Sequence, residues 1–299
     1  MVSQISVVIN TFNEEKNIRS AIKSVDWADE ILVCDMYSED KTSEIAKKMG
    51  AKVVFHKREG FVEPARNFAI SKASNEWVLV LDADEIISPD LAKRIQEIVK
   101  KTKSHDFIQI PRKNIIFGKW MRAAGWWPDY QVRLFKKGQV IWSDMIHSQP
   151  ETTGQGLTLP PEEKYTIVHN NYQTISQFVE RINRYTTVES KELIRTGYKF
   201  SWKDLIEKPV SEFLSRFFAN RGFEDGLHGL VLSLLQSFSF IIVYLKVWEK
   251  GRFKEENITI SDVKLETERS GQSINYWFKE IAKSKSPFSN FLKIFKGNK

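Results

Sequence analysis

The sequence contains a single cysteine, no internal repeat and no low-complexity tract. One cysteine in 299 residues excludes a disulfide scaffold and a cysteine-based zinc site, and it fits a reducing compartment. The opening residues, MVSQISVVIN, lack the basic segment, long apolar segment and cleavage site of a secretory signal, so we expect none. The composition, with 41% hydrophobic and 28% charged residues, is typical of a globular chain.

Basic residues exceed acidic residues by 45 to 38, which gives a formal net charge of +7 and an isoelectric point near 9.2. A mild positive charge favours anionic partners such as a nucleotide, a phospholipid headgroup or a nucleic acid. The chain shows no RNP-like, helix-turn-helix or zinc motif, and its lysines concentrate near the C-terminus. We therefore expect no nucleic-acid partner.

Short apolar runs rich in β-branched residues alternate with segments of helical periodicity over the first hundred residues. The predicted strands cover residues 5–10, 30–34, 51–55 and 77–81. The predicted helices cover residues 14–25, 40–49, 63–73 and 89–101. We expect Asn13 to cap the first helix and Gly50 to end the second. This succession predicts a parallel sheet with helices on both faces.

The pattern changes after residue 105, where a strand at 107–111 precedes an irregular aromatic segment at 114–142. A turn-rich loop at 151–163 follows, and the chain becomes helical from about residue 174. The bulky aromatic side chains between Trp120 and Trp142 can form an acceptor platform or fill the core. We favour the core for most of them and contact with an acceptor for Trp126 or Trp127.

Polar and acidic residues follow the predicted strands where each strand ends. In parallel sheets, ligands bind outside these carboxyl ends. Asp82 directly follows the apolar run WVLVL, where a charge is costly unless it is paired or binds a cation. Asp82 and Asp84, two residues apart in a turn, can hold Mg²⁺ or Mn²⁺ with diphosphate oxygens completing the shell. Asp35, taken alone, can equally be a turn residue or a helix cap.

These segments carry a resemblance to a known family. Residues 6–15 (SVVINTFNEE), 30–42 (EILVCDMYSEDKT), 65–70 (ARNFAI) and 78–85 (VLVLDADE) resemble, in this order, the nucleotide-sugar-binding half of inverting GT-A glycosyltransferases of family 2. Three later segments are similar to its lipopolysaccharide core β-1,4-glucosyltransferase branch: DYQVRLFKKG (129–138), WSDMIH (142–147) and RGFEDGLHGL (221–230). The resemblance covers roughly residues 3 to 250.

The resemblance implies that Thr11, Asn13 and Glu14 line the pocket for the base and ribose of a nucleotide, and that Asp35 hydrogen-bonds the uracil. The chain departs from the family where the common D-D-G-S after the second strand reads Asp-Met-Tyr-Ser. Met36 therefore stands where a carboxylate would otherwise contact the donor.

The resemblance also implies that Arg66, with Asn67, faces the diphosphate, since a guanidinium suits a phosphate bidentately. The alternative for Arg66 is a surface ion pair with Glu63. In the segment Asp82-Ala83-Asp84, the first carboxylate would contact the ribose and the second would hold the metal.

An inverting transfer needs a base that takes the proton of the acceptor hydroxyl. The candidates are Asp129, Asp144 and His147, and two of them have an open alternative. Asp129 can pair with Arg133, four residues on, and His147 can be a metal ligand or a structural histidine. The branch usually shows His-Glu where this chain has His147-Ser148, so a further candidate base is missing.

Residues 229–245 carry no charge, and 17 residues reach about 26 Å in a helix against a hydrocarbon core of about 30 Å. Residues 279–299 hold six lysines and one glutamate, and a spanning helix would place them opposite a cytoplasmic catalytic domain, against the positive-inside tendency. We therefore expect a helix that lies in the membrane interface or between subunits, with the lysines on anionic headgroups. An ordinary buried helix is the alternative.

Together these patterns predict an α/β protein with a GT-A, Rossmann-like sheet and a C-terminal helical extension. The expected divisions are a catalytic domain at 1–170, a helical region at 171–255 that associates with membrane or with a second copy, and a basic tail at 256–299. The resemblance predicts an inverting hexosyltransferase that uses Mg²⁺ or Mn²⁺ and a UDP-sugar. Its acceptor would be a cell-envelope glycan or a lipid-linked acceptor. We expect a cytoplasmic enzyme peripherally attached to the inner face of the cell membrane. A polyprenyl-phosphate sugar synthase and a non-catalytic nucleotide-binding module are the alternatives.

Overall fold

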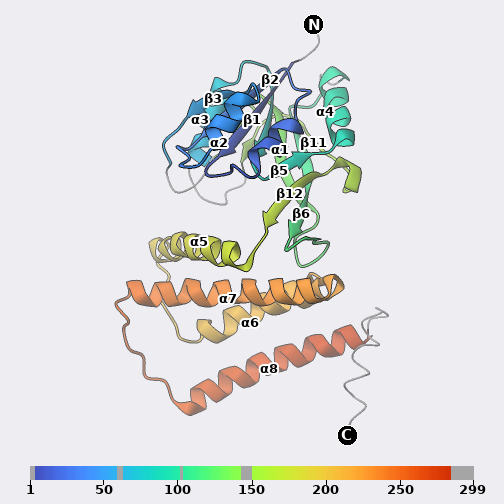
Figure 1. Cartoon of the computed structure of the whole chain (residues 1–299). Helices are drawn as coiled ribbons and strands as arrows, with labels where there is room; N and C mark the ends of the chain where they lie inside the picture. Colours follow the sequence, from blue (N-terminus) through green and yellow to red (C-terminus); the bar gives the residue numbers. More distant parts are fainter. Residues whose placement is uncertain (1–3, 59–62, 102–103, 143–149, 284–299) are drawn as a thin grey trace. The chain divides into compact units, whose positions relative to one another are not determined.

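The structure is a computed structural model that describes residues 4–58, 63–101, 104–142 and 150–283. The chain divides into two compact units (Figure 1). The first unit comprises residues 1–115 and 128–171, and the second comprises residues 116–127 and 172–299. The short insertion 116–127 thus belongs with the C-terminal helices.

Four parallel strands form one half of the sheet in the first unit, in the order β3-β2-β1-β4. They are β1 (Ile5–Thr11), β2 (Glu30–Asp35), β3 (Lys52–Phe55) and β4 (Trp77–Asp82). Every residue of β1 is buried, because both faces of the strand are covered, and its central residues Val7, Val8 and Ile9 are apolar on both faces.

Helices cover both faces of these strands, as the sequence predicts. They are α1 (Ile18–Lys23), α2 (Thr42–Lys48), α3 (Glu63–Lys72) and α4 (Pro89–Lys101). Val7 and Ile9 of β1 share a core with α1, α2 and α4, whereas Val8 shares the opposite core with α3 (Figure 1). The predicted Rossmann-like arrangement is confirmed.

One predicted helix start is wrong. Helix α1 begins at Ile18 with Asn17 at the N-cap position, not near Asn13. Asn13 instead adopts a left-handed backbone with φ 54°, and its Oδ1 accepts a hydrogen bond from the backbone N–H of Glu39 at 2.8 Å. The predicted helix stop is confirmed, because Gly50 follows α2 with φ +83°.

The other half of the sheet continues from β4 in the order β8-β6-β12-β5. Its strands are β5 (Glu85–Ile87), β6 (Phe107–Ile116), β8 (Asp129–Lys136) and β12 (Ile167–Tyr172). Strand β8 runs antiparallel to β4 and β6, and β12 runs antiparallel to β5. Strand β6 is thus longer than the predicted strand at 107–111.

The short elements are β7 (Lys119–Trp120), β9 (Val140–Ile141), β10 (Glu151–Thr152), β11 (Gly156–Thr158) and the 3-10 turn Glu163–Tyr165.

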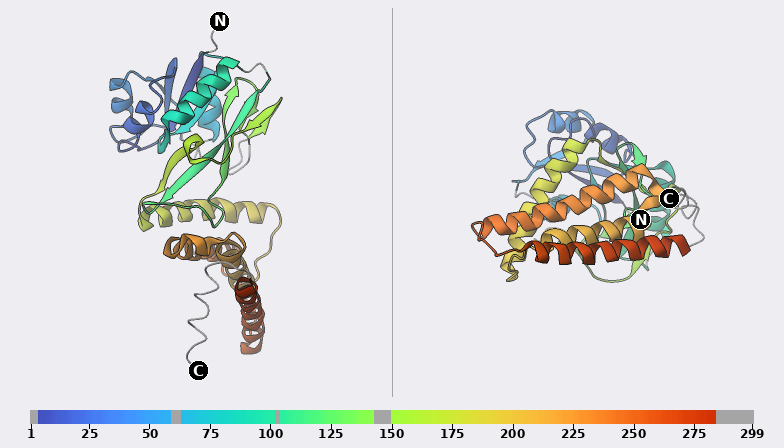
Figure 2. Two further views of the ribbon diagram at one scale, coloured as in Figure 1. Left: turned by 90° about the vertical axis from the view of Figure 1, so that its right-hand side faces the viewer. Right: turned by 90° about the horizontal axis from the view of Figure 1, so that it is seen from below.

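The second unit is helical. Its long helices are α5 (Ile175–Arg195), α6 (Asp204–Leu214), α7 (Leu227–Lys250) and α8 (Ile260–Lys283). A capping box between Thr174 and Gln177 begins α5, and a π-helical turn at Ser215–Ala219 extends α6. Helix α7 packs against α5 and α6, and α8 packs against α6 (Figure 2). Much of the segment predicted as a basic tail from residue 256 is thus the helix α8.

The segment 221–230 is a structural junction inside the second unit. The Oδ2 atom of the buried Asp225 accepts hydrogen bonds from the backbone N–H groups of Arg122 (2.9 Å) and Ala123 (2.8 Å). Gly229 lies so close to the chain that a Cβ there would stand 1.8 Å from the carbonyl oxygen of Gly222. This motif therefore holds the insertion 116–127 against the start of α7.

Helix α7 contains the uncharged segment predicted at 229–245 and presents an apolar stripe to solvent. By length and composition it can cross a membrane, with a mean hydropathy of 2.0 over its most apolar window. Core helices of soluble proteins can be equally long and apolar, but they are mostly buried, whereas only 28% of the most apolar part of α7 is buried. The exposed side chains of the stripe are Leu227, Leu234, Phe238 and Leu245.

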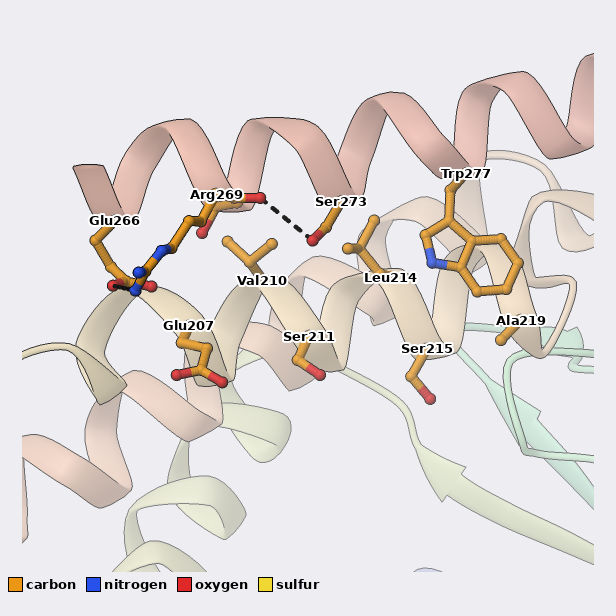
Figure 3. A pocket seen from close by; sticks show the side chains of 11 residues that line it. Glu207, Val210, Ser211, Leu214, Ser215, Ala219, Glu266, Arg269, Ser273 and Trp277 are labelled. Carbon is orange, nitrogen blue, oxygen red and sulfur yellow. Dashed lines mark hydrogen bonds and ion pairs between the residues drawn. The ribbon is translucent and has the colours of Figure 1, made fainter. Parts of the chain in front are cut away.

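A groove of about 550 Å³ lies between α6 and α8 (Figure 3). Ser211, Ser273 and Trp277 are among its lining residues, together with the nearly buried Glu266. None of the predicted site residues lines this groove.

Candidate functional site

Two strand ends form a buried polar floor at the carboxyl edge of the parallel strands. The register pairs Thr11 of β1 with Asp35 of β2, and both side chains are almost completely buried. Asp35 accepts one hydrogen bond at Oδ1 from the backbone N–H of Ser38 (2.7 Å). Asp35 Oδ2, Thr11 Oγ1 and both amide atoms of Asn10 have no hydrogen-bond partner among the described residues.

Unpartnered buried polar atoms of this kind cost about 1–3 kcal/mol each, so their concentration at a strand edge points to a ligand. The floor offers a carboxylate acceptor, a hydroxyl and an amide. A nucleobase, whose edge carries both donors and acceptors, matches this set. Asp35 and Thr11, both predicted site residues, lie side by side in the register of β1 and β2.

The loops that follow β1 and β2 bind each other at the rim of this floor. The backbone N–H of Asn13 donates to Ser38 Oγ, and that of Glu14 donates to Thr42 Oγ1, both at 2.8 Å. Asn13 and Glu14 thus shape the rim through their backbone. Met36, which replaces the family's carboxylate, is buried in the core beside α3.

Asp82, at the end of β4, is held by two arginines. Its Oδ1 accepts from Arg66 Nη2 at 2.6 Å, and its Oδ2 accepts from Arg133 Nη2 at 2.7 Å. Burial alone would raise the pKa of Asp82, but the charges of Arg133 and Arg66 outweigh it and hold that pKa well below its ordinary value. Asp82 is therefore a permanent anion with both oxygens engaged, which is poorly suited to metal ligation.

Arg66 projects from α3, and its Nη2 atom forms an ion pair with Asp82. The predicted alternative was a surface ion pair with Glu63. Its Nε is buried without a partner among the described residues. Asn67 is engaged elsewhere: its amide exchanges two hydrogen bonds with the backbone of Trp142, at 2.7 and 3.1 Å. Arg66 can thus meet a phosphate, whereas Asn67 ties α3 to the end of β9.

Behind Asp82, Glu85 and two arginines form a buried charged cluster. Glu85 is fully buried, and its Oε1 accepts from Arg133 (2.7 Å) and Arg112 (3.3 Å). Its Oε2 accepts from the backbone N–H of Asp82 at 3.0 Å. Burial alone would lower the pKa of Arg133, but Asp82 and Glu85 raise it instead. These groups fix the turn that carries both predicted aspartates.

Asp129, a predicted general base, is part of the same cluster. Arg112 Nε donates to its Oδ2 at 2.7 Å, Arg112 Nη2 forms an ion pair with the same oxygen at 2.7 Å, and Asn114 Nδ2 donates to it at 2.9 Å. Gln131 Nε2 donates to its Oδ1 at 2.7 Å. Burial would raise the pKa of Asp129, but Arg112 and these hydrogen bonds lower it. Its partner is thus Arg112 and not Arg133 as the sequence spacing suggested, and a carboxylate so held is a weak proton acceptor.

Asp84 has different surroundings. Its Oδ2 lies 3.4 Å from Nε2 of the buried His169, which β12 brings beside the turn. The other ring nitrogen of His169, Nδ1, lies 2.7 Å from Asn114 Oδ1. Each of the other cluster carboxylates has an arginine partner, whereas no arginine or lysine nitrogen lies within 4.0 Å of the Asp84 carboxylate in the described part of the chain.

The excess negative charge of the cluster therefore resides on Asp84. A divalent cation ligated by Asp84 Oδ2 and His169 Nε2 would neutralise it, and carboxylate and imidazole are both ligands of Mn²⁺. Within the described ranges, no group of three or more histidine, cysteine or acidic side chains could hold a metal ion alone. The remaining ligands would have to come from a substrate or water. Asp144 and His147 lie outside the described residues.

The aromatic residues divide between cores. Phe135 and Trp142 are buried in the first unit. Trp126 and Trp127 are partly buried in the second unit, where Trp126 meets Tyr172 edge-on at 6.4 Å and Trp127 meets Trp120 at 5.2 Å. Their predicted contact with an acceptor stays a prediction.

Sequence reasoning did not single out five residues of this site: Glu85, Arg112, Asn114, Arg133 and His169. Glu85 lies in the motif VLVLDADE and Arg133 in the motif DYQVRLFKKG. A charged residue beside apolar strand residues is the signal that could have identified both as site residues. His169 lies in a strand (IVHNNY) whose alternation buries it, and nothing in its local sequence connects it with Asp84. The antiparallel half of the sheet makes that connection.

Comparison with known proteins identifies the first unit. The family description "Glycosyl transferase family 2" matches residues 6–149. An uncharacterized glycosyltransferase of Rickettsia typhi is 30% identical over 273 residues, which is 87% of this chain and 92% of that protein. The lipopolysaccharide core biosynthesis glycosyltransferase LpsC of Rhizobium meliloti is 20% identical over 84% of this chain and 94% of its own length.

Among solved structures, the chain is similar to glucosyl-3-phosphoglycerate synthase from Mycobacterium tuberculosis in complex with Mn²⁺, UDP-glucose and phosphoglyceric acid. The identity is 17%, the TM-score is 0.42, and the match covers 67% of this chain and 82% of that one. The family match spans the unpartnered strand ends and the acidic turn, and the Rickettsia relative extends it over most of the chain. This chain is a glycosyltransferase and belongs to glycosyl transferase family 2.

Proposed function

We propose that this glycosyltransferase is a metal-dependent inverting enzyme that takes a hexose from a UDP-sugar and attaches it to a cell-envelope glycan or a lipid-linked acceptor. The observation that carries the proposal is the pairing of Asp84 and His169, an anionic site without an arginine, at the same sheet edge as the unpartnered Asp35. A nucleotide diphosphate offers a base for one and phosphates for the other.

In the proposed complex, Asp35 and Thr11 bind the base through the atoms that have no partner in the described chain. Asp82 keeps lone pairs for the ribose hydroxyls, since each carboxylate oxygen accepts more than one hydrogen bond. Arg66, held beside Asp82, meets the diphosphate with its remaining N–H groups. Ala83 is buried and packs in the core, so it spaces the two aspartates without a contact of its own.

Asp84 and His169 would hold Mg²⁺ or Mn²⁺, which when bound neutralises charge on the leaving diphosphate. This assigns the metal to Asp84 and leaves Asp82, the second predicted ligand, to its arginines. For the proton of the acceptor hydroxyl, Asp144 and His147 stay the proposed candidates. Asp129 is the weakest of the three because its carboxylate already accepts from Arg112, Asn114 and Gln131.

The engagement of Asp129 favours a second candidate, a polyprenyl-phosphate sugar synthase. A phosphate acceptor is already an anion, so it attacks the anomeric carbon without a strong base. The two candidates differ in acceptor alone and share the proposed donor site.

We also propose that the enzyme works in the cytoplasm, attached peripherally to the inner face of the cell membrane. Support comes from the exposed stripe of α7 and from the six lysines between residues 279 and 299. Apolar contact and attraction to anionic headgroups act together in such helices. Self-association through the same stripe is the other arrangement that would cover it.

The test is product analysis with the purified full chain. A panel of UDP-sugars is offered with Mn²⁺, with Mg²⁺ and with EDTA, and the products are analysed by mass spectrometry with a glycan acceptor or a polyprenyl phosphate. Metal-dependent consumption of one UDP-sugar supports the proposal, and the acceptor that gains mass decides between the two candidates. UDP binding without hydrolysis or transfer of any donor would instead indicate a non-catalytic nucleotide-binding module.

A further inference from the structure

Asn114 lies between the predicted base and the proposed metal ligand. Its amide joins Asp129 Oδ2 (2.9 Å) to His169 Nδ1 (2.7 Å), and the residue is fully buried. We propose that Asn114 is a positioning residue that holds His169 with its Nε2 lone pair facing Asp84, and that Asp129 acts through Asn114 instead of taking a proton from the acceptor. This inference rests on the metal-dependent function proposed above.

The first step concerns which end of the amide faces which partner. An ionised carboxylate can only accept hydrogen bonds, and the lowered pKa of Asp129 keeps it ionised. The amide atom 2.9 Å from Asp129 must therefore be the NH₂ group. The carbonyl oxygen of Asn114 is left to face His169, so the chemistry of the neighbour settles the orientation.

The second step concerns the tautomer of His169. A carbonyl oxygen can only accept, so the nitrogen 2.7 Å away, Nδ1, must carry a proton and donate it. In a neutral imidazole one ring nitrogen donates and the other accepts. When the ring is neutral, as coordination of a metal through Nε2 requires, Nε2 presents its lone pair toward Asp84 Oδ2, 3.4 Å away.

The third step follows from two acceptors that face each other. A lone pair and a carboxylate oxygen repel each other when nothing lies between them, whereas both can coordinate one cation. By holding the proton of the neutral ring on Nδ1, Asn114 leaves Nε2 available to share one cation with Asp84. Partners that fix the ring of a metal-binding histidine typically change metal affinity 10–100-fold when they are mutated.

The anchoring of Asp129 makes this arrangement rigid. Arg112 donates a hydrogen bond to Asp129, forms an ion pair with it and also reaches Glu85, whose other oxygen accepts from the backbone N–H of Asp82. The amide that orients His169 is thus tied to the turn that carries Asp84. Because both carboxylate oxygens of Asp129 accept hydrogen bonds from these groups, Asp129 is poorly suited to take a proton from the acceptor.

The test compares three variants of the full-length protein. Asn114→Leu removes both hydrogen bonds and keeps the branch at Cγ, whereas Asn114→Asp keeps an oxygen that accepts from His169 Nδ1–H and gives Asp129 a carboxyl neighbour with which it must share a proton. Thr166→Val is the matched control, because Thr166 is also fully buried in the first unit and its hydroxyl donates to the Glu163 carbonyl at 2.8 Å. It removes a buried hydrogen bond without touching the chain to His169.

Two readouts are measured. The first is the tautomer of His169 in the metal-free protein, from the ¹⁵N chemical shifts of its ring, with a His169→Gln sample to assign the signals. The second is the affinity for Mn²⁺ in the presence of UDP, from the electron paramagnetic resonance of free Mn²⁺. We expect the Nδ1–H tautomer in wild type, Asn114→Asp and Thr166→Val, and a mixture of tautomers in Asn114→Leu. Mn²⁺ affinity should fall about 10–100-fold in Asn114→Leu and much less in the other two.

The outcomes separate this inference from the proposed function. If Asn114→Leu keeps the Nδ1–H tautomer and binds Mn²⁺ like Thr166→Val, Asn114 has no positioning role and the inference is wrong. If the tautomer changes in Asn114→Leu but wild type binds no Mn²⁺, the positioning of His169 is supported while the proposed metal site fails. Equal losses of affinity in Asn114→Leu and Thr166→Val would also overturn the inference, because they would report instability alone.

Discussion

At the scale of single residues, two aspartates of one turn have opposite surroundings. Asp82 has two guanidinium partners, and Asp84 has a histidine that a third group orients. The chemical type is the same and the separation is two residues, so the partners decide what each carboxylate can do. An anion neutralised by arginines is a fixed part of the fold, whereas an anion beside an imidazole is available to a cation.

Asp84→Asn is expected to reduce transfer at least about 100-fold at saturating Mn²⁺, because a neutral amide is a weak ligand and metal stabilisation is worth several kcal/mol. The fold should be unchanged, since no guanidinium loses its partner. Initial rates of donor consumption measure the effect. The matched control is Asp26→Asn, an exposed aspartate before β2. Wild-type turnover in the Asp84 variant would remove the metal from this residue.

Asp35→Ala is expected to weaken UDP binding roughly 10–100-fold, the range for one hydrogen bond to a charged group. The contact is equal in ground and transition states, so KM should rise more than kcat falls. The free energy of unfolding should fall by about 1 kcal/mol, because Oδ1 of Asp35 accepts from the backbone N–H of Ser38, whereas Oδ2 has no protein partner to lose in the described chain. Titration calorimetry with UDP gives the affinity directly. An unchanged affinity would make Asp35 a turn residue only.

The free energy of unfolding at low pH depends on the buried carboxylates of this cluster. The pKa values of Asp82 and Asp129 are both lowered in the fold, so the unfolded chain binds more protons between the folded values and the ordinary value of about 3.9. The stabilisation is therefore complete above about pH 4 to 5 and is lost as the pH falls through the folded values. Asp129→Asn should unfold at lower urea concentration than wild type at pH 7, with a loss of roughly 1–3 kcal/mol.

The difference between Asp129→Asn and wild type should shrink as the pH falls below about 4, because wild type then loses the same charge. Urea unfolding followed by tryptophan fluorescence between pH 7 and pH 2.5 measures it. A difference that stays constant over this range would mean that Asp129 carries no depressed pKa.

At the scale of elements, the motif 221–230 works as a joint. Asp225 binds backbone N–H groups of the insertion 116–127, and Gly229 lets α7 start against the Gly222 carbonyl. Segments separated by about a hundred residues are thereby held in one unit. The motif that resembles the lipopolysaccharide branch is accounted for here by structure, without any role in binding a donor.

Gly229→Ala is expected to destabilise the second unit by about 3 kcal/mol or more, because its Cβ would stand 1.8 Å from the Gly222 carbonyl oxygen and only backbone movement relieves the clash. Gly271→Ala is the matched control. It lies inside α8 with nothing within 4 Å of the added Cβ, so it should stabilise by about 0.5–1 kcal/mol. Thermal unfolding by circular dichroism compares them. Equal melting temperatures for the two variants would contradict the close approach.

At the scale of the whole molecule, charge and exposed apolar surface are unevenly distributed along the chain. The predicted donor-site residues belong to the first unit, whereas the stripe of α7 and the lysines at 279–299 belong to the second. Donor chemistry and the proposed membrane attachment are therefore separable by mutation.

The enzyme is expected to sediment with anionic vesicles at low salt and to dissociate partly at 1 M salt, where the Debye length is about 3 Å. Each lysine near the surface adds about 1 kcal/mol. Deletion of residues 284–299 removes four lysines and should weaken binding without affecting hydrolysis of the donor. A cut at residue 251 is a poorer test, because α8 packs on α6 and would be lost as well.

Leu234→Gln with Phe238→Gln tests the apolar part, since both side chains are largely exposed and their replacement costs little stability. This double variant should bind less to neutral and anionic vesicles alike. Pelleting that is independent of salt, of the deletion and of the double variant would refute peripheral attachment. Resistance of the wild type to carbonate extraction would indicate a spanning helix instead.

The parallel half of the sheet and its helices could be predicted from local sequence patterns, together with the edge at which ligands are expected to bind. Apolar β-branched runs leave few alternatives to buried strands, and Gly50 and Pro89 mark helix ends by their backbone preferences. Asp35, Asp82 and Asp84 can be identified from the sequence because each lies at or just after the end of a buried strand, where an unpaired charge would be costly. These signals are local, so they can be detected along the chain.

The ion-pair and hydrogen-bond partners of those residues can be seen only in the folded chain. Arg112, Asn114, Arg133 and His169 come from three strands that follow the parallel half, and each of those strands runs antiparallel to a neighbour. Spacing suggested Arg133 for Asp129, but residues four apart in a strand point to the same face without touching, whereas Arg112 lies opposite Asp129 in the register. Which charges meet is set by the register between strands distant in sequence, and no local pattern records it.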